Sequence, residues 1–416
     1  MTVHGTLNLS TMQRQLALLA CTAALVPFAS AQSCLPEGLV LTSQAQVNSF
    51  PTDHPGCTTL EGNLQIGPGS VTNLAPLAQL TAVEGYLQVG LNPQLTTLAG
   101  LENITSVGGS LGITGNAQLT DLSGLAGLTT VGGLMEVSAN NNLTSLAGLQ
   151  NITSVGSYLD ISDSPGLTDL QGLEGIETIS GSLIIRDNPA LASMQGLAPT
   201  SIGGGLDLMN NPQLMDLSAA AGLTSLGGPL SLNGNTAILS LQELSGITAI
   251  NGVLRVMGSS GLMSLDGLQN IDPATILNLI IVNNPGLFQC AAENLCDYLA
   301  IPASMANITG NATGCSSRAE VEEACTLLSV EEGMHIEPAL SVFPNPSNGL
   351  VHVQVEGQGS MELRVIDLSG RTAHAERLVA TGTSTHVIDL AHLATGIYTL
   401  RLDHSTGSFT TRLVHH

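Results

Sequence analysis

The chain has 416 residues, of which 43% are hydrophobic but only 2% aromatic, and it contains no Trp. Its formal net charge is −23, from 32 acidic and nine basic residues, and all nine basic residues are Arg. Residues 32–333 hold 25 of the acids and only three Arg. Nucleic acid and anionic membrane surfaces are therefore not expected as partners. The simplest role of this charge is to keep a leucine-rich surface soluble.

Residues 1–31 have the pattern of a secretory signal peptide, with Arg14, an apolar run over residues 16–28, and Ala29-Ser30-Ala31 at the cleavage point. The run is too short and too well ended for a membrane span, so we expect none. A second interpretation stays open, because Leu18-Leu19-Ala20-Cys21 loosely resembles a lipoprotein box that would acylate Cys21. Removal of the signal peptide would leave six cysteines.

One unit repeats nine times over residues 71–286, nearly always with a step of 24 residues. In residues 95–118 its apolar members lie first three and then two positions apart: Leu95, Leu98, Leu101, Ile104, Val107, Leu111 and Ile113. A repeat of this length predicts a solenoid in which each turn stacks only on its neighbours. One turn alone would not offset the entropy cost of ordering its residues, so stacking is required.

The spacing also predicts the course of each turn. A step of three residues differs from the 3.6 of an α-helix and suits a tight coil or 3₁₀-like arc. The step of two residues marks a short strand with both large side chains turned inward. Glycines such as Gly108 and Gly109 precede that strand, and an Asn such as Asn116 follows it. We expect the stacked Asn side chains to bond the backbone at this corner.

The six cysteines lie beyond both ends of the repeats and therefore indicate disulfides in two caps. They are Cys34, Cys57, Cys290, Cys296, Cys315 and Cys325. A zinc site is the competing interpretation, but the tight ligand spacing is missing. We expect Cys34 to pair with Cys57. Of the three pairings open to the other four, we favour Cys290 with Cys315 and Cys296 with Cys325.

The segments around the repeats complete the predicted organisation. Residues 32–70 form an N-terminal cap with a first strand, and residues 287–328 form a C-terminal cap with two short helices at 290–300 and 317–328. Ser317 and Glu320 have the spacing of a capping box for the second helix. A linker over 329–338 follows. The alternating runs of residues 339–416, broken by turns, predict a small antiparallel β-sandwich.

Residues 34–325 resemble the receptor L-domain family, a relative of leucine-rich repeats found in the ectodomains of insulin- and EGF-type receptors. The resemblance rests on the run from Cys57 to Ile66, CTTLEGNLQI, and on the turns of the form L-x-x-L-x-x-I-x-x-V-x-G-x-L-x-I that follow it. It implies a right-handed, mostly parallel β-solenoid. It carries no catalytic residues, and the ligands differ among members of the family.

Residues 340–414 resemble the type A C-terminal sorting domain of the type IX secretion system. The resemblance rests on FPNPSNG at 343–349, IDLSGR at 366–371, and IDL at 388–390 followed by GIY at 396–398. The motif residues are Pro344, Asn345, Pro346, Gly349, Gly370, Arg371, Gly396 and Tyr398. This resemblance implies a Gram-negative bacterium and the type IX machinery as a partner. The protein would be released or attached to the outer cell surface, usually after cleavage of the domain.

The repeats contain no His and no Cys, which removes most nucleophile–base pairs and metal sites, so we expect neither catalysis nor a cofactor or metal. Glu136, Asp160 and Asp207 do project from the strands, and a glycan-active enzyme or a structural coat protein stays as an alternative. A solvated acidic face is the preferred interpretation of these carboxylates.

We predict that the outward positions of the strands form a binding or adhesion surface for an unknown protein or glycan. Strand side chains alternate, so three rows of outward residues stack along the solenoid, and they vary from turn to turn. The candidate binding residues are Tyr86, Glu136, Tyr158, Asp160, Arg186, Asp207, Met209 and Met257. Met209, Val253, Met257, Ile280 and Val282 are expected to form an exposed apolar stretch suited to a partner protein.

Overall fold

The structure is a computed structural model that describes residues 1, 32–332, 340–404 and 407–416. The chain forms two compact units, Met1–Cys325 and Thr326–His416. The predicted signal peptide and most of the predicted linker lie outside the described residues. Among those described, no helix combines the length and apolar character needed to cross a membrane.

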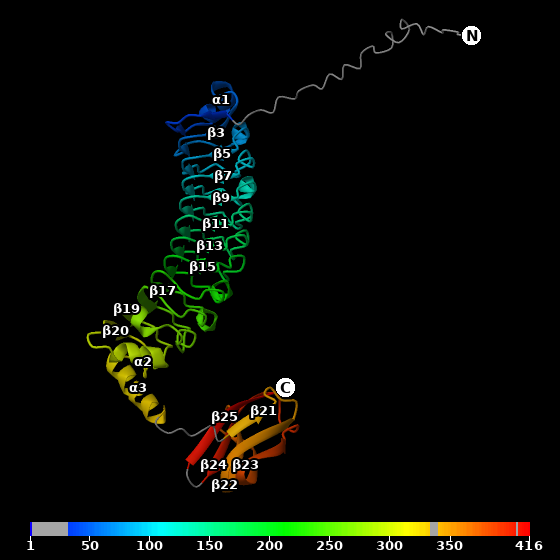
Figure 1. The fold of residues 1–416 in the computed structure, drawn as a ribbon, viewed down its shortest axis with the longest axis vertical. Coiled ribbons are helices and arrows are strands. Elements are labelled where there is room, and N and C mark those ends of the chain that lie inside the picture. The colour runs from blue at the N-terminus through cyan, green and yellow to red at the C-terminus, as the bar shows by residue number, and fades with distance from the viewer. Residues whose placement is uncertain (2–31, 333–339, 405–406) are drawn as a thin grey trace. The chain divides into compact units, whose positions relative to one another are not determined.

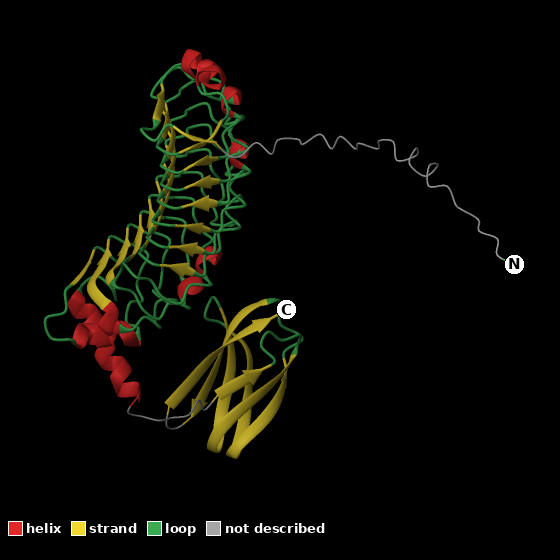
Figure 2. Ribbon diagram, turned by 45° about the horizontal axis from the view of Figure 1, so that its top comes forward, coloured by secondary structure: helices red, strands yellow, loops and turns green. Residues whose placement is uncertain are grey.

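The first unit is a solenoid with two parallel sheets, whose strands run in two columns along the stack (Figures 1 and 2). Its larger sheet has 12 strands: β2 (Leu39–Leu41), β4 (Leu64–Ile66), β6 (Leu87–Gly90), β8 (Leu111–Thr114), β10 (Met135–Ser138), β12 (Leu159–Ser162), β14 (Leu183–Arg186), β16 (Leu206–Met209), β17 (Leu230–Asn233), β18 (Gly252–Met257), β19 (Ile276–Val282) and β20 (Ala306–Thr309).

The second sheet of the solenoid has eight very short strands: β1 (Gln32–Cys34), β3 (Cys57–Leu60), β5 (Ala82–Val83), β7 (Ser106–Val107), β9 (Thr130–Val131), β11 (Ser154–Val155), β13 (Thr178–Ile179) and β15 (Ser201–Ile202). The sequence did not predict this sheet. Each two-residue strand from β5 to β15 buries one residue of the three-residue period, as β7 does with Val107. The period alone therefore does not separate a strand from an arc.

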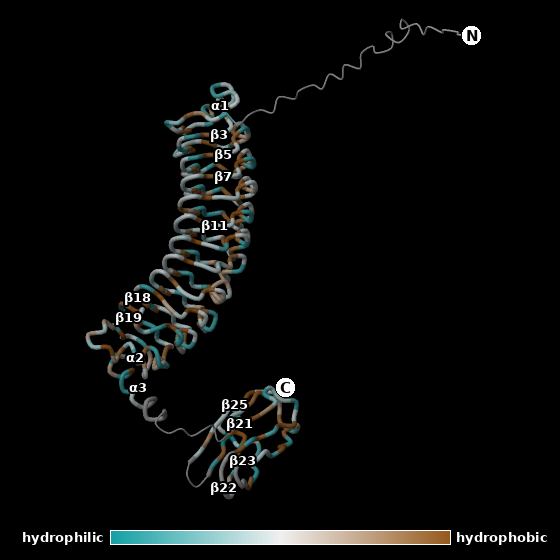
Figure 3. Tube along the Cα trace, viewed as in Figure 1, coloured by the Kyte–Doolittle hydropathy of each residue, from teal (hydrophilic) through white to brown (hydrophobic). Residues whose placement is uncertain are grey.

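The remaining part of each turn is an arc, and five arcs contain a 3₁₀ helix: η1 (Ala75–Leu77), η2 (Ser123–Leu125), η3 (Ser218–Ala220), η4 (Gln242–Leu244) and η5 (Pro273–Thr275). The seven apolar positions of the repeat are buried as predicted. In the turn that begins at Leu95, each of the seven side chains is at most 1% exposed. Apolar and polar residues consequently alternate around every turn (Figure 3).

A buried row made mostly of Asn side chains joins the turns at the corner that follows the strands of the larger sheet from β6 onward. Asn116 Nδ2 donates to Val89 O (2.9 Å), and Asn116 N donates to Asn140 Oδ1 (2.9 Å). Two turns use Ser164 and Ser259 at this position. The predicted amide row therefore exists, and it supplies partners for backbone groups that would otherwise be buried unpaired.

The N-terminal cap contains a helix that the sequence did not predict, α1 (Gln44–Asp53). It begins with a capping box between Ser43 and Gln46, and it buries Val47 and Phe50 over the first turn. The predicted Cys34–Cys57 disulfide is present and joins β1 to β3.

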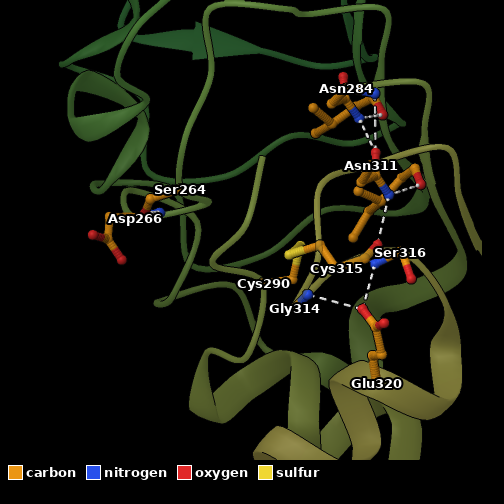
Figure 4. Close-up of a disulfide and its surroundings, with 11 residues drawn as sticks. Ser264, Asp266, Asn284, Cys290, Asn311, Gly314, Cys315, Ser316 and Glu320 are labelled. Atoms are coloured by element: carbon orange, nitrogen blue, oxygen red, sulfur yellow. Dashed lines mark hydrogen bonds between the residues drawn. A yellow bond between two sulfur atoms is a disulfide. The ribbon is translucent and has the colours of Figure 1, made fainter. Parts of the chain in front are cut away.

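The C-terminal cap contains α2 (Glu293–Ala300) and α3 (Arg318–Glu332), so α3 continues into the first residues of the predicted linker. Cys290 pairs with Cys315 and Cys296 with Cys325, as predicted. The Asn row also continues into the cap, where Asn284 N donates to Asn311 Oδ1 (3.0 Å; Figure 4).

The predicted capping box of α3 is only half correct. Ser317 Oγ accepts from Glu320 N (3.3 Å), but the carboxylate of Glu320 accepts from Gly314 N (2.8 Å) and Ser316 N (2.9 Å; Figure 4). These bonds, first that of Ser316, lower the pKa of Glu320. The carboxylate thus closes the loop that carries Cys315 instead of capping its own helix.

The second unit is a five-stranded antiparallel sheet made of β21 (Leu340–Phe343), β22 (Leu350–Asp367), β23 (Thr372–Asp389), β24 (Gly396–His404) and β25 (Gly407–His415). Both halves of β22 turn odd-numbered residues into one core, including Val351, Val353, Leu363 and Val365. β21 and β24 pair with opposite ends of β22, and β24 pairs with β25. All five strands contribute to this one core, so the unit is a small sandwich.

Candidate binding surface

The outward positions of the 12-stranded sheet, called the strand face below, stack in the register expected from the sequence. Glu136 pairs with Gly112 on one side and with Asp160 on the other, and Asp160 pairs with Ile184. From β4 to β19 the middle row is Gln65, Gln88, Gly112, Glu136, Asp160, Ile184, Asp207, Ser231, Arg255 and Ile280. Val40 of β2 and Asn307 of β20 extend it at the two ends.

The candidate residues differ widely in exposure. Tyr86 (37%) and Tyr158 (39%) are exposed, as is Arg186, whereas Asp160 is only 6% exposed. Glu136, Asp207, Met209 and Met257 are half-buried. The prediction of a solvated acidic face is therefore wrong at Asp160. Strands stack only about 4.8 Å apart, so side chains of adjacent turns cover one another.

The same crowding corrects the predicted apolar stretch. Val282 is buried, and Met209, Val253, Met257 and Ile280 are half-buried. These residues do not form an open apolar patch.

A hollow of about 330 Å³ opens on the strand face around Gly112. It is lined by Gln65, Tyr86, Gln88, Ser110, Gly112, Leu134 and Glu136. The hollow exists because Gly112 has no side chain in a row otherwise occupied by larger residues. A Cβ atom at this position would lie 2.0 Å from Gln88 Oε1, so a larger residue would displace that amide and fill the space.

Hydrogen bonds hold the polar walls of the hollow in place. Gln88 Nε2 donates to Thr114 Oγ1 (2.7 Å), and Ser138 Oγ donates to Glu136 Oε1 (2.6 Å). Tyr86 Oη donates to Gln65 Oε1 at the longer distance of 3.5 Å. Because these contacts restrict the side chains before a ligand arrives, less entropy is lost on binding.

Next to the hollow lies a charged cluster. Arg186 Nη2 donates to Asp160 Oδ2 (3.1 Å), while Asp160 Oδ1 and Ser162 Oγ are buried. Burial raises the pKa of Asp160, against the opposing effects of the Ser162 hydroxyl and of Arg186. Burial likewise raises the pKa of Asp207, opposed by the Ser231 hydroxyl, Arg255 and Arg186.

The structure brings together only part of the candidate set. Tyr86 and Glu136 both line the hollow. Arg186 forms an ion pair with Asp160 and lies opposite Met209 in the register of the sheet. Met257 lies two strands beyond Met209. The candidate set omitted Gln65, Gln88, Ser110, Gly112 and Leu134. The only sequence signal for them was a Gly among larger residues in the middle row.

The part of the chain that the structure describes contains no group of three His, Cys, Asp or Glu side chains placed to hold a metal ion. The chemistry that the strand face offers is hydrogen bonding from amides, hydroxyls and a carboxylate, together with contact to Tyr and Leu side chains.

The motif residues of the second unit lie at its turns and strand ends. Asn345 Nδ2 donates to Arg412 O (2.7 Å), and Asn345 Oδ1 accepts from Val414 N (2.8 Å). The loop that contains Pro344 and Pro346 therefore holds strand β25. Gly349 adopts φ +121° with Ala391 close by, a conformation that a side chain would strain.

The other motif residues shape two turns. Asp367 accepts from Ser369 Oγ (2.5 Å), Arg371 N (3.0 Å) and Arg371 Nη2 (3.1 Å), and these bonds, chiefly that of the Ser369 hydroxyl, lower its pKa to about 2. Gly370 has φ +81° in this turn. Gly396 begins β24. Tyr398 Oη donates to Ala394 O (2.7 Å).

Comparison with protein families matches two parts of the chain. Residues 56–146, which include the whole hollow, match the receptor L domain. Residues 341–416, which include every motif residue of the second unit, match the secretion system C-terminal sorting domain. A comparison with curated proteins returned no match. The chain therefore carries a receptor L domain within its solenoid and a C-terminal sorting domain of the type IX secretion system.

Proposed function

We propose that the protein is a secreted or surface-attached binding protein of a Gram-negative bacterium, and that its strand face recognises a protein or glycan ligand. The hollow around Gly112 is the observation that carries this proposal. Its volume of about 330 Å³ falls at the lower end of the range for small-molecule sites, which suits one sugar ring or one side chain of a protein ligand.

The walls of the hollow indicate which groups it would bind. Gln65, Gln88 and Glu136 provide acceptors and donors for hydroxyl or amide groups, and Tyr86 and Leu134 provide an apolar side. Tyr158 and Arg186 lie farther along the same face and would extend the contact. This combination favours a neutral or cationic polar ligand over an anionic one.

The sorting domain supports export through the type IX machinery. We propose that the solenoid is the exported cargo and that the sorting domain directs its passage across the outer membrane, after which the cargo is released or attached to the surface.

Catalysis on glycans is the second candidate function, and one observation favours it. Glu136 and Asp160 are neighbours in the register, and the pKa of Asp160 is raised, as in the carboxylate pairs of glycosidases. Against it, Asp160 is almost completely buried and is held by Arg186. We therefore favour binding without catalysis.

Incubation of the secreted chain with glycan and peptide arrays tests both functions. A binding protein leaves the bound glycan intact, whereas an enzyme shortens it, and Glu136→Gln and Asp160→Asn would abolish the shortening. Absence of binding to any class of ligand would argue for a structural coat protein.

A further inference from the structure

A second surface of the solenoid, separate from the strand face, exposes large apolar side chains at one position of four consecutive turns. We call it the apolar stripe: Met215 (60% exposed), Leu239 (68%), Met263 (59%) and Phe288 (54%). Each of these residues directly follows a buried residue that opens its turn. The four are therefore aligned by the repeat itself.

The fold does not require apolar residues at this position. The six preceding turns carry Thr72, Thr96, Thr120, Thr144, Thr168 and Ala192 there. Those turns stack in the same way, so a small or polar side chain is sufficient. The change to Met, Leu and Phe adds exposed apolar surface that contributes nothing to the core.

Backbone bonds join this position in successive turns at both ends of the stripe. Met215 N donates to Ala192 O (3.1 Å), and Phe288 N donates to Met263 O (3.2 Å). With turns about 4.8 Å apart, the four side chains cover a continuous strip roughly 15 Å long. A contiguous apolar strip of this kind is uncommon on a protein surface unless something binds to it.

The charge beside the stripe is negative. Asp216 directly follows Met215, and its carboxylate accepts from Ser218 N (2.9 Å) and from Ser193 Oγ (2.5 Å). These bonds, first that of Ser193, lower the pKa of Asp216, so it is ionised at neutral pH. Glu243 and Asp266 lie in the arcs of the next two turns.

Basic residues are scarce in these turns. Within residues 214–290, all of which the structure describes, the one basic residue is Arg255, and it belongs to the strand face, where it pairs with Ser231. A second copy of this chain, with a net charge of −23, or an anionic lipid surface would be repelled.

We propose that the apolar stripe is the docking site of a cationic amphipathic protein segment, whose apolar side chains cover Met215, Leu239, Met263 and Phe288 while its Lys or Arg residues face Asp216 and Asp266. This site is independent of the strand face, so it stands or falls apart from the proposed function. The solenoid would thus bind a second partner through the four exposed residues of the stripe.

The chain itself supplies a substitution that spares the fold, because Thr occupies the same position in five turns. The test variant is Met215→Thr/Leu239→Thr/Met263→Thr. The control, Leu277→Thr, removes a side chain of similar exposure (59%) that belongs neither to the stripe nor to the candidate binding residues. The probes are two synthetic helical peptides with Leu along one face, one with Lys and the other with Glu beside the Leu residues. Thermal melting of each variant confirms that it is folded.

We expect the Lys peptide to bind the full chain and to lose affinity by about tenfold or more with the test variant, but by less than about twofold with the control. The Glu peptide should not bind. Failure of the Lys peptide to bind, or equal binding to the test variant, would overturn the proposal. Equal binding of the Glu peptide would overturn its charge argument. Self-association that the test variant abolishes, or binding to anionic vesicles, would assign the stripe to a second copy or to lipid instead.

Discussion

The buried Asn row provides a direct test of how the solenoid is held together, because Asn140 can be removed at the centre of the stack. Its side-chain amide donates to Ile113 O (2.8 Å), its Oδ1 accepts from Asn116 N (2.9 Å), and the residue is completely buried. In Asn140→Ala the backbone N–H of Asn116 would be buried without an acceptor, and the carbonyl of Ile113 would lose a donor.

The expected loss follows from these two contacts. A buried donor left unpaired costs roughly 1–3 kcal/mol, and the lost neutral hydrogen bond costs roughly 0.5–1.5 kcal/mol. The free energy of unfolding should therefore fall by about 2–4 kcal/mol. Since each turn contacts only its neighbours, amide exchange should accelerate most in the turns that contain Asn116 and Asn140.

Urea unfolding measured by circular dichroism, together with hydrogen exchange of the Asn116 amide, checks this prediction. Asn142→Ala is the matched control, because Asn142 is exposed and its one polar contact, from Nδ2 to Gln118 Oε1, is 3.5 Å long. If Asn140→Ala lost less than about 0.5 kcal/mol relative to this control, the row would not be a structural support.

Two further predictions concern the ion pair and the sorting domain. Arg186→Ala should leave Asp160 buried without its cation, so the folded-state pKa of Asp160 should rise further. We expect a destabilisation of roughly 1–3 kcal/mol at neutral pH. Because the folded-state pKa lies above the unfolded-state pKa, this destabilisation should disappear as the pH falls below the unfolded-state pKa. A loss of stability that did not depend on pH, in urea unfolding at several pH values, would contradict this. Deletion of residues 339–416 should leave a folded solenoid that stays in the periplasm, since the first compact unit ends at Cys325; recovery of the truncated protein from the medium would contradict a sorting role.

Much of the solenoid was predictable because stacking imposes the same requirement on every turn. Leu111 and Ile113 had to face inward, and Asn116 had to serve the corner, so the period specified both the core and the amide row. The cap disulfides followed because their cysteines lie beyond the repeats. Helix α1 was missed because it occurs once and buries only Val47 and Phe50, which leaves no period to detect.

The binding surfaces were less predictable because they depend on side-chain crowding. The alternation of a strand predicts that Asp160 points outward, but only the positions of neighbouring side chains show that it is buried. The hollow likewise depends on where the Gln88 amide lies relative to Gly112. The residues of the apolar stripe are not among the seven repeated apolar positions. The sequence alone therefore does not show whether an apolar residue such as Leu239 is exposed or buried.

The most direct test of the recognition function is to fill the hollow. The middle row already holds an Ile at position 184. Gly112→Ile should displace the Gln88 amide, which lies within 2.0 Å of an added Cβ, and occupy the hollow. Gly222→Ile is the control, because an added Cβ there meets only Pro199 O at 3.7 Å. On glycan and peptide arrays, Gly112→Ile should lose the ligand signal by about tenfold or more, while Gly222→Ile keeps it. Equal signals from both variants and the unsubstituted chain would show that ligand recognition does not take place in the hollow.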